Sequence, residues 1–261
     1  MRITERRLVI EMVEEIRRIG RIRDFKLSYH GRGVTSSAIV RALEEPCAAN
    51  ISIETVRAVH EIWGLSHIID ALDAEIKNKI LKVRGSPEEP AAILRTSYGT
   101  LTIWYQFPRY GPNRHGELLR MCAKGRYEEV RNILGLETAP RSFADSLSII
   151  NRENLRPDIV IVKGSFRFAN DIRTETEDEV KEKAVVIDPK IEMGEGDVEQ
   201  LKAYAHLFPE GSKFICPCMN RVTATHRPKG WDVIEDVCPN GEGVDVFRER
   251  LGKAVGEMCS S

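Results

Sequence analysis

The first fifty residues carry apolar side chains at helical spacing. Between positions 9 and 19 they fall on one face of a helix, at Val9, Ile10, Val13, Ile16 and Ile19. Two glycines and a Thr-Ser-Ser run interrupt the pattern, and a second short helix over 39–43 should end before Pro46. We therefore predict an N-terminal helical extension over residues 1–50.

A stronger helical pattern begins just after residue 50. Ser52 can cap a helix through its hydroxyl, and Glu54 suits the positive end of the helix dipole. Apolar residues then alternate at three- and four-residue steps, at Ile62, Leu65, Ile69, Leu72 and Ile76. The spacing predicts a helix that runs to about Lys79.

Strand patterns dominate the middle of the chain. Residues 91–107 predict a hairpin that turns at Gly99, because a polar turn separates two runs rich in β-branched and aromatic residues. Residues 159–162 and 184–187 are unbroken apolar runs, as expected for strands covered on both faces. Residues 213–216 predict a further strand.

Helices separate and follow these strands. The predicted helices cover 197–208 and the amphipathic tail 244–258, and an insertion-like region over 108–155 holds a helix near 127–134. Strands interleaved with helices predict an α/β fold with a mixed central sheet flanked by helices.

Composition restricts the class of protein. An apolar content of 42% and a charged content of 30% are ordinary for a globular protein. No run of about 18 apolar residues predicts a membrane span, and the charged start of the chain lacks the apolar core of a signal peptide. We expect a cytoplasmic protein without a membrane partner.

The net charge of −1 excludes a general polycation. Charge is nevertheless uneven, since the first thirty residues are rich in arginine and the stretch 171–199 is strongly acidic. A nucleic-acid partner would therefore meet local patches, and a site made of carboxylates would itself lower the net charge.

Two carboxylates and a lysine stand at the ends of the two buried strands. Asp158 directly precedes one strand and Asp188 directly follows the other. If these strands are antiparallel neighbours, both carboxylates meet at one edge of the sheet. Lys190 lies two residues beyond Asp188, so in an extended chain it projects from the same face. Carboxylate oxygens suit Mg²⁺ or Mn²⁺, and the ammonium can orient water or stabilise a phosphate.

These residues read Pro157-Asp158 and, 30 residues later, Asp188-Pro189-Lys190. The pattern resembles the PD-(D/E)XK motif of the restriction-endonuclease-like nucleases. The resemblance implies a restriction-endonuclease-like fold and a metal-dependent nuclease whose metal ligands include Asp158 and Asp188. The proline between Asp188 and Lys190 predicts a strand end or a bulge at that point.

Two further segments support the resemblance. Gln200-Leu-Lys-Ala-Tyr204 is similar to the QxxxY motif of the RecB-like branch, which implies that Gln200 and Tyr204 contact water or phosphate. The segment around His60-Glu61-Ile-Trp-Gly64 resembles a helix of McrC-type nuclease subunits and implies that Glu61 is the third metal ligand. Lys213, on the following strand, is a candidate phosphate contact.

Plain structural interpretations compete with each of these residues. Asp158 after a proline can be a turn residue, and Tyr204 can be an ordinary packing residue. Glu61 can be a solvated residue on an amphipathic helix, and His60, Glu54 or Glu117 can take its place in the site. Trp104, Tyr105 and Phe107 are predicted to belong to the core rather than to a platform for bases.

The cysteines allow two interpretations. Cys216, Cys218 and Cys238 follow the motif helix while Cys47 precedes the helix of Glu61, an order similar to that of iron–sulfur RecB-like exonucleases. Their spacing differs from those proteins, so free thiols are the first expectation.

The sequence thus predicts a nuclease core over residues 51–225 and a C-terminal helical tail over 226–261. We expect a Mg²⁺- or Mn²⁺-dependent DNA endonuclease of the restriction, defence or repair type, acting as a homodimer. Two alternatives remain open at this point. One is a RecB-like exonuclease that acts on ends or single strands, and the other is a nuclease-fold subunit that binds DNA or a motor partner without catalysis.

Overall fold

The computed structural model describes residues 3–19, 30–31, 34–49, 51–76, 90–105, 121–134, 136–146, 157–172, 180–205 and 208–260. Its helices are α1 (Ile3–Ile19), α2 (Ser36–Glu44), α3 (Ile53–Ala71), α5 (Tyr127–Leu134), α7 (Glu195–Ala205) and α8 (Gly243–Ser260), with 3-10 turns η1 (Ala169–Ile172) and η2 (Ala224–His226). Its strands are β1 (His30–Gly31), β2 (Val34–Thr35), β3 (Glu75–Ile76), β4 (Ala92–Thr96), β5 (Gly99–Tyr105), β6 (Ile159–Lys163), β7 (Ala184–Ile187), β8 (Lys213–Pro217) and β9 (Asp232–Ile234).

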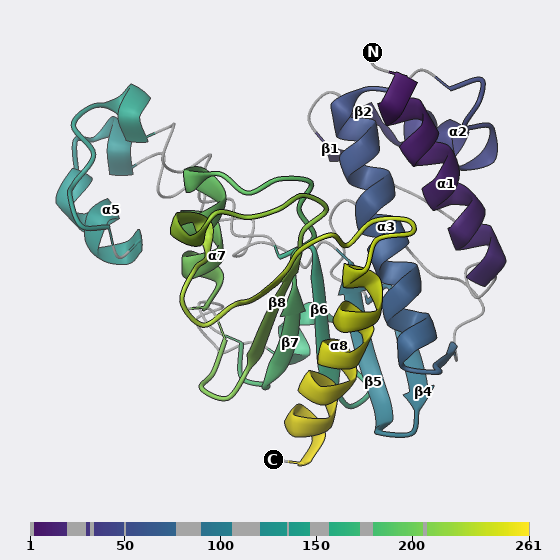
Figure 1. Ribbon diagram of the computed structural model, residues 1–261. Coiled ribbons are helices and arrows are strands. Elements are labelled where there is room, and N and C mark those ends of the chain that lie inside the picture. The colour runs from purple at the N-terminus through teal and green to yellow at the C-terminus, as the bar shows by residue number, and fades with distance from the viewer. Residues whose placement is uncertain are drawn as a thin grey trace.

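The helices of the N-terminal half pack on one another beside the sheet. The predicted apolar stripe of α1 is buried at Val9, Val13 and Ile16, and α1 and α2 both lie against α3. Figure 1 shows these helices grouped at one side of the sheet. The prediction of helices in this region is confirmed, and α2 ends before Pro46 as expected.

Helix α3 begins where its cap was predicted but ends early. The Ser52 side chain accepts a hydrogen bond from the Thr55 backbone N–H at 3.2 Å and forms a capping box with that residue. The helix ends at Ala71, and the prediction that it reaches Lys79 is wrong. Asp73 adopts a left-handed backbone (φ 44°), which breaks the helix, and Ile76 lies in β3 instead.

In the described residues one sheet holds seven strands in the order β3-β4-β5-β6-β7-β8-β9. Pairing is antiparallel from β3 to β7 and parallel from β7 to β9. The predicted hairpin is β4–β5, and the strands predicted at 159–162, 184–187 and 213–216 are β6, β7 and β8. The fold is therefore mixed α/β, with a mostly antiparallel sheet flanked by helices.

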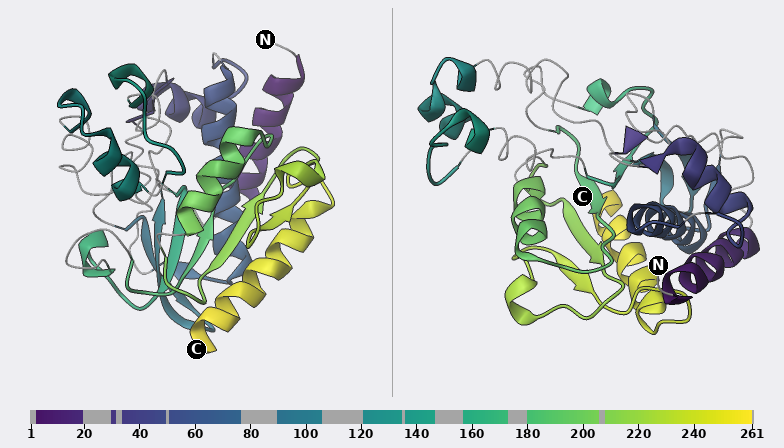
Figure 2. Two further views of the ribbon diagram at one scale, coloured as in Figure 1. Left: turned by 90° about the vertical axis from the view of Figure 1, so that its left-hand side faces the viewer. Right: turned by 90° about the horizontal axis from the view of Figure 1, so that it is seen from above.

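The two faces of the sheet have separate cores. Ile159, Ile161, Val185 and Ile187 point to the face that holds α3 and α8, and α1 and α2 pack on α3 in the same apolar cluster. The alternate residues of the same strands, such as Val160, point to the face covered by α7. Figure 2 shows α7 and α8 on opposite sides of the strands. Burial on both faces explains why β6 and β7 are continuously apolar.

The residues expected to form a C-terminal tail belong to this core. Strand β9 extends the sheet beside β8, and α8 packs against α3 and the neighbouring strands. Phe247, Leu251 and Val255 of α8 are fully buried in the same apolar cluster as the N-terminal helices. The packing thus joins the predicted extension and tail to the predicted core.

Helix α5 lies away from the sheet in the views of Figures 1 and 2. Val130 of this helix and Cys122 form a small apolar cluster of their own. Among the described residues, no helix is long and apolar enough to cross a membrane.

Candidate functional site

The pairing of β6 with β7 decides where the two predicted aspartates lie. Ile159 at the start of β6 pairs with Ile187 at the end of β7, which confirms that the strands are antiparallel neighbours. The next pair in this antiparallel register, one residue before Ile159 and one after Ile187, sets Asp158 opposite Asp188. Directly opposed residues have Cβ atoms about 4.5–5.5 Å apart. The two carboxylates therefore meet at one edge of the sheet, together with Lys190; we call these three residues the carboxylate rim.

Strand geometry also places the rim on one face. Side chains alternate along a strand, so Asp158 has the direction of Val160, and Asp188 has that of Val186. Val160 and Val186 both belong to the cluster beneath α7. Lys190 follows Asp188 by two residues and returns to the same side. The three polar side chains thus face the end of the sheet that α7 covers.

Pro189 does not disturb this arrangement. The N–H groups of Asp188 and Lys190 donate to the carbonyls of Ile215 and Pro217 at 3.1 and 3.0 Å. The segment therefore continues the parallel ladder of β7 with β8 beyond the end of β7. In such a ladder alternate residues donate to the same neighbour, so position 189 needs no N–H toward β8. The proline occupies the position where it removes no bond to that strand.

Asp188 and Lys190 form a buried ion pair. Asp188 is 1% exposed, and Lys190 Nζ lies 2.7 Å from its Oδ2. Both oxygens of Asp188 are buried without a hydrogen bond of good geometry from the described residues. Carboxylate oxygens that are buried without aligned donors can accept a cation, which supplies charge without directional N–H groups.

The charges of the rim shift two pKa values. Burial raises the pKa of Asp158 well above its usual range, and the negative charges of Asp188 and then Glu61 raise it further. Burial alone lowers the pKa of Lys190, but the carboxylates of Asp188 and Asp158 outweigh it and hold that pKa well above the usual value. The rim therefore favours positive charge, in the form of a proton or a cation between the carboxylates.

Helix α7 places polar side chains around the ammonium of Lys190. Lys190 Nζ donates to Gln200 Oε1 at 3.2 Å, and Gln200 Nε2 donates to the Tyr204 hydroxyl at 2.6 Å. Asp197, which the sequence analysis did not select, has Oδ1 3.7 Å from Nζ. Its other oxygen accepts from the Gly194 N–H at 2.9 Å, beside the start of α7. An acid one turn before Gln200 was the available signal for this residue.

Glu61 approaches the rim from the opposite side, on α3. Its helix crosses close to the motif segment, because a Cβ added to Gly64 would lie 3.6 Å from Pro189 Cγ. Glu61 Oε2 accepts a hydrogen bond of 2.5 Å from the Tyr105 hydroxyl. Glu61 is near enough for its charge to raise the pKa of Asp158. The structure thus brings Glu61 toward Asp158 from another layer of the fold.

The alternatives to Glu61 are less well placed. His60 is buried and its Nε2 lies 3.1 Å from the Val237 carbonyl. Burial lowers the pKa of His60 to about 4, although that contact partly opposes the shift. Glu54 is exposed in the first turn of α3. Glu117 lies outside the described residues.

The two predicted nucleic-acid contacts lie in different places. Tyr204 of α7 is fully buried, and its hydroxyl accepts a hydrogen bond from Gln200 Nε2 beside Lys190. Lys213 was expected near the rim, but β8 runs parallel to β7 and pairs Lys213 with Val185. Lys213 therefore lies toward the opposite end of the sheet, where its Nζ contacts Glu257 Oε2 at 2.6 Å.

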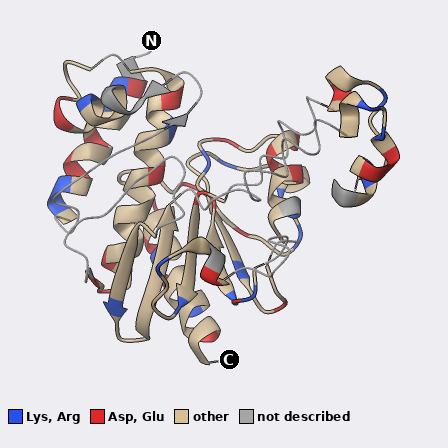
Figure 3. Ribbon diagram, turned by 180° about the vertical axis from the view of Figure 1, so that it is seen from behind, with Lys and Arg blue, Asp and Glu red and all other residues tan. Residues whose placement is uncertain are grey.

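The arginines of α1 are engaged within the protein. Arg7 pairs with Glu11 at 2.8 Å, and Arg17 donates to the carbonyls of Leu43 and Glu44 at 2.8 Å. Figure 3 shows basic and acidic residues interspersed on the helices. Arg7 and Arg17 therefore have partners within the protein.

The cysteines are free thiols, and they are distributed across the molecule. Cys216 and Cys218 lie in the cluster beneath α7, whereas Cys238 packs against the core on the opposite face. Within the described part of the chain, no group of three or more His, Cys, Asp or Glu side chains is gathered closely enough to hold a metal. Asp158 and Asp188 therefore form a pair that Glu61 approaches, rather than a closed set of three ligands.

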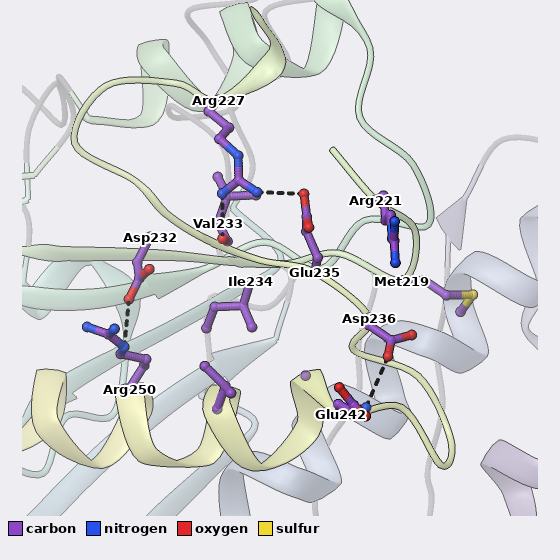
Figure 4. A pocket seen from close by; sticks show the side chains of 12 residues that line it. Met219, Arg221, Arg227, Asp232, Val233, Ile234, Glu235, Asp236, Glu242 and Arg250 are labelled. Carbon is purple, nitrogen blue, oxygen red and sulfur yellow. Dashed lines mark hydrogen bonds and ion pairs between the residues drawn. The ribbon is translucent and has the colours of Figure 1, made fainter. Parts of the chain in front are cut away.

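A pocket of about 640 Å³ lies at another part of the sheet, along β9 and the start of α8. Figure 4 shows arginines and acids facing each other across it, with Arg227 bonded to Glu235 and Arg250 near Asp232. None of the predicted site residues lines this pocket. Two of its arginines are paired with acids that also line it, Arg227 with Glu235 and Arg250 with Asp232.

No protein-family model, no curated protein and no solved structure matches this chain.

Proposed function

We propose that this protein is a Mg²⁺- or Mn²⁺-dependent DNA nuclease whose active centre is the carboxylate rim. The observation that carries the proposal is the register of β6 with β7, which opposes Asp158 to Asp188 beside the buried ammonium of Lys190. Two oxygen donors with a fixed cation are suited to a hard divalent metal and a phosphate. The resemblance to PD-(D/E)XK nucleases points to the same residues.

The residues of the rim fit a divalent cation. Asp188 presents buried oxygens without aligned hydrogen-bond donors, and Asp158 lies in a field that favours added positive charge. Asp158 and Asp188 would hold the metal, with Glu61 as the third ligand. When bound, such a cation lowers the pKa of water and neutralises charge on a phosphodiester.

The remaining residues position groups around the reacting phosphate. Lys190 carries a positive charge next to the carboxylates and would stabilise the negative charge that develops on phosphorus-bound oxygens. Gln200 accepts from this ammonium and fixes its direction, and Tyr204 in turn holds the amide of Gln200. Preorganised groups of this kind lower a barrier because they need little reorganisation during the reaction.

The alternatives differ in what they require of the same residues. An iron–sulfur exonuclease would need clustered cysteines, whereas the described ones are divided between two faces of the sheet. A binding subunit without catalysis would not need a lysine buried against two carboxylates, which costs free energy by desolvation. The endonuclease and the exonuclease share the chemistry of the rim, and the form of the DNA substrate separates them.

The direct test is cleavage of linear, circular and branched DNA with Mg²⁺ or Mn²⁺. We expect the wild-type protein to cleave and Asp188→Ala and Lys190→Ala to lose activity by a factor of about 100 or more, the scale of losing one electrostatic stabiliser. Asp245→Ala and Lys229→Ala replace exposed residues of the same types and serve as controls. Equal cleavage by all five proteins would refute the assignment, because a contaminating nuclease would then explain the activity.

A homodimer follows from the same proposal, since one rim cuts one strand and a double-strand break needs two. The terminal helices α1 and α8 are candidate contact surfaces, and Val246 of α8 is 44% exposed. Light scattering with and without DNA measures the mass of the particle. A monomer that nicks one strand would limit the proposal to single-strand cleavage.

A further inference from the structure

The Tyr105 hydroxyl is buried at the level of the carboxylate rim, on the side opposite α7. Strand β5 pairs with β6 so that Tyr105 stands beside Ile159, and Ile159 stands beside Ile187. These three residues form one row across three strands, one position inside the row of Asp158 and Asp188. A side chain of β5 thus ends next to the proposed metal site without belonging to either motif strand.

Tyr105 points away from α7, toward α3. Leu101, Ile103 and Tyr105 alternate onto the face that α3 covers, and all three are fully buried. A buried phenol needs a hydrogen-bond partner, and this one donates to Glu61 Oε2 at 2.5 Å. The acceptor is a carboxylate, and bonds to charged groups are the shorter and stronger ones.

We propose that Tyr105 is a positioning residue that holds Glu61 for metal binding, an inference that rests on the proposed nuclease function. Glu61 sits on α3 and must reach around the end of the sheet to join Asp158. A glutamate side chain has several rotatable bonds, and fixing them on binding costs free energy. The hydroxyl of a rigid, fully buried ring fixes one carboxylate oxygen in advance. Hydrogen bonds from such outer residues commonly orient metal-ligating carboxylates and raise metal affinity.

A purely structural role for Tyr105 predicts different behaviour. In that case the Tyr105 hydroxyl donates to Glu61 only because a buried hydroxyl needs an acceptor. Its removal then lowers the free energy of unfolding without changing metal affinity. The positioning role predicts weaker metal binding with little change in DNA binding. The two roles are therefore separated by measuring metal affinity directly.

The experiment compares wild type, Tyr105→Phe, Glu61→Gln and the double variant by calorimetric titration with Mn²⁺ in the absence of DNA. We expect Tyr105→Phe to weaken Mn²⁺ binding by about tenfold or more, the usual scale for losing a hydrogen bond that orients a metal ligand. In cleavage assays the metal concentration for half-maximal rate should rise by the same factor, and saturating Mn²⁺ should restore most of kcat. The double variant should bind no more weakly than Glu61→Gln alone, because the two residues act through one interaction.

The matched control is Tyr98→Phe, which removes a phenol at the turn end of the same hairpin, where Tyr98 is 37% exposed. It should leave Mn²⁺ affinity unchanged. If Tyr105→Phe binds Mn²⁺ as tightly as wild type, or if the losses of Mn²⁺ affinity add in the double variant, the positioning role is overturned. Cleavage by the wild type and its loss in Asp188→Ala would still leave the nuclease proposal intact in that case. If the wild-type protein itself binds no Mn²⁺, the nuclease proposal fails and this inference fails with it.

Discussion

Replacing Asp158 with asparagine should remove the proposed nuclease activity and at the same time stabilise the fold. The substitution keeps the size of the side chain and removes one of two opposed carboxylates. Asp188 keeps its ion pair with Lys190 at 2.7 Å. Residues that serve a reaction are often held in arrangements that the fold alone would not favour, and this variant tests whether Asp158 is one of them.

The size of the effect follows from the separation of the carboxylates. At about 5 Å and an effective dielectric constant of about 20, two negative charges repel by about 3 kcal/mol. Lys190 offsets part of this repulsion, so we expect a gain of about 1–2 kcal/mol in metal-free protein, scaled from that same estimate. For a chain of this length, such a gain raises Tm by about 2–8 °C.

The gain should depend on pH with a definite sign. The folded-state pKa of Asp158 is raised above its unfolded value by burial and by the charges of Asp188 and Glu61. Below the unfolded pKa, near 4, the side chain is protonated in both states and the repulsion is absent. As pH rises through the folded pKa, the wild-type protein loses stability while the asparagine variant does not. The difference should therefore be small at pH 4 and largest at neutral to alkaline pH.

Urea unfolding in EDTA, measured at several pH values, gives the difference in free energy of unfolding directly. DNA cleavage with Mn²⁺ is measured on the same preparations. An asparagine variant that is less stable than wild type by about 1 kcal/mol or more at pH 8 would refute the reasoning. Asp158 would then be a structural turn residue whose charge the fold requires.

Three further predictions concern other parts of the structure. Burial lowers the pKa of His60 from 6.5 to about 4, so neutral His60 contributes stability above pH 6.5 that is lost as pH falls toward 4, by up to about 3 kcal/mol. The urea midpoints of wild type and His60→Gln should therefore converge as pH falls across this range. Midpoints that stay the same distance apart at every pH would contradict the prediction. Gly243→Ala should destabilise by about 2 kcal/mol or more, because the new Cβ would lie 1.9 Å from the Glu235 carbonyl oxygen; an unchanged thermal melt would show that this turn relaxes freely. Lys213→Ala should cleave DNA at the wild-type rate, because Lys213 lies toward the opposite end of the sheet from Asp188. A large loss of cleavage rate in this variant would show that Lys213 takes part in the reaction.

The candidate site combines residues of very different predictability. Asp188 and Lys190 are two residues apart on a segment that extends a strand, so the period of two puts them on one face whatever the rest of the fold does. Gln200 and Tyr204 are four apart on a helix, and their contact follows from helical spacing alone. Tyr105 and Glu61 are 44 residues apart on a strand and a helix of different layers. No local pattern connects those two, and an aromatic residue in a strand is normally assigned to the core.

The sequence predicted a helix or strand correctly where a single local preference decides its structure. Apolar periodicity determined α1 and α8, and glycines at its start and Pro209 after it determined α7. The Ser52 cap determined the start of α3, and unbroken β-branched runs determined β6 and β7. The end of α3 was missed because apolar spacing continues past Ala71 while Asp73 turns the backbone. Strand β9 was missed because three residues are too short to show a period.

The sequence by itself therefore determined the class of the fold, the strands that carry Asp158 and Asp188, and the face that Asp188 shares with Lys190. Only the tertiary structure decided that β6 and β7 are antiparallel neighbours in the register that opposes Asp158 to Asp188. It also decided that β8 runs parallel to β7, which moved Lys213 away from the site. The reason is physical: backbone and side-chain preferences act over a few residues, whereas the choice of neighbouring strand depends on burying both faces of the whole sheet at once.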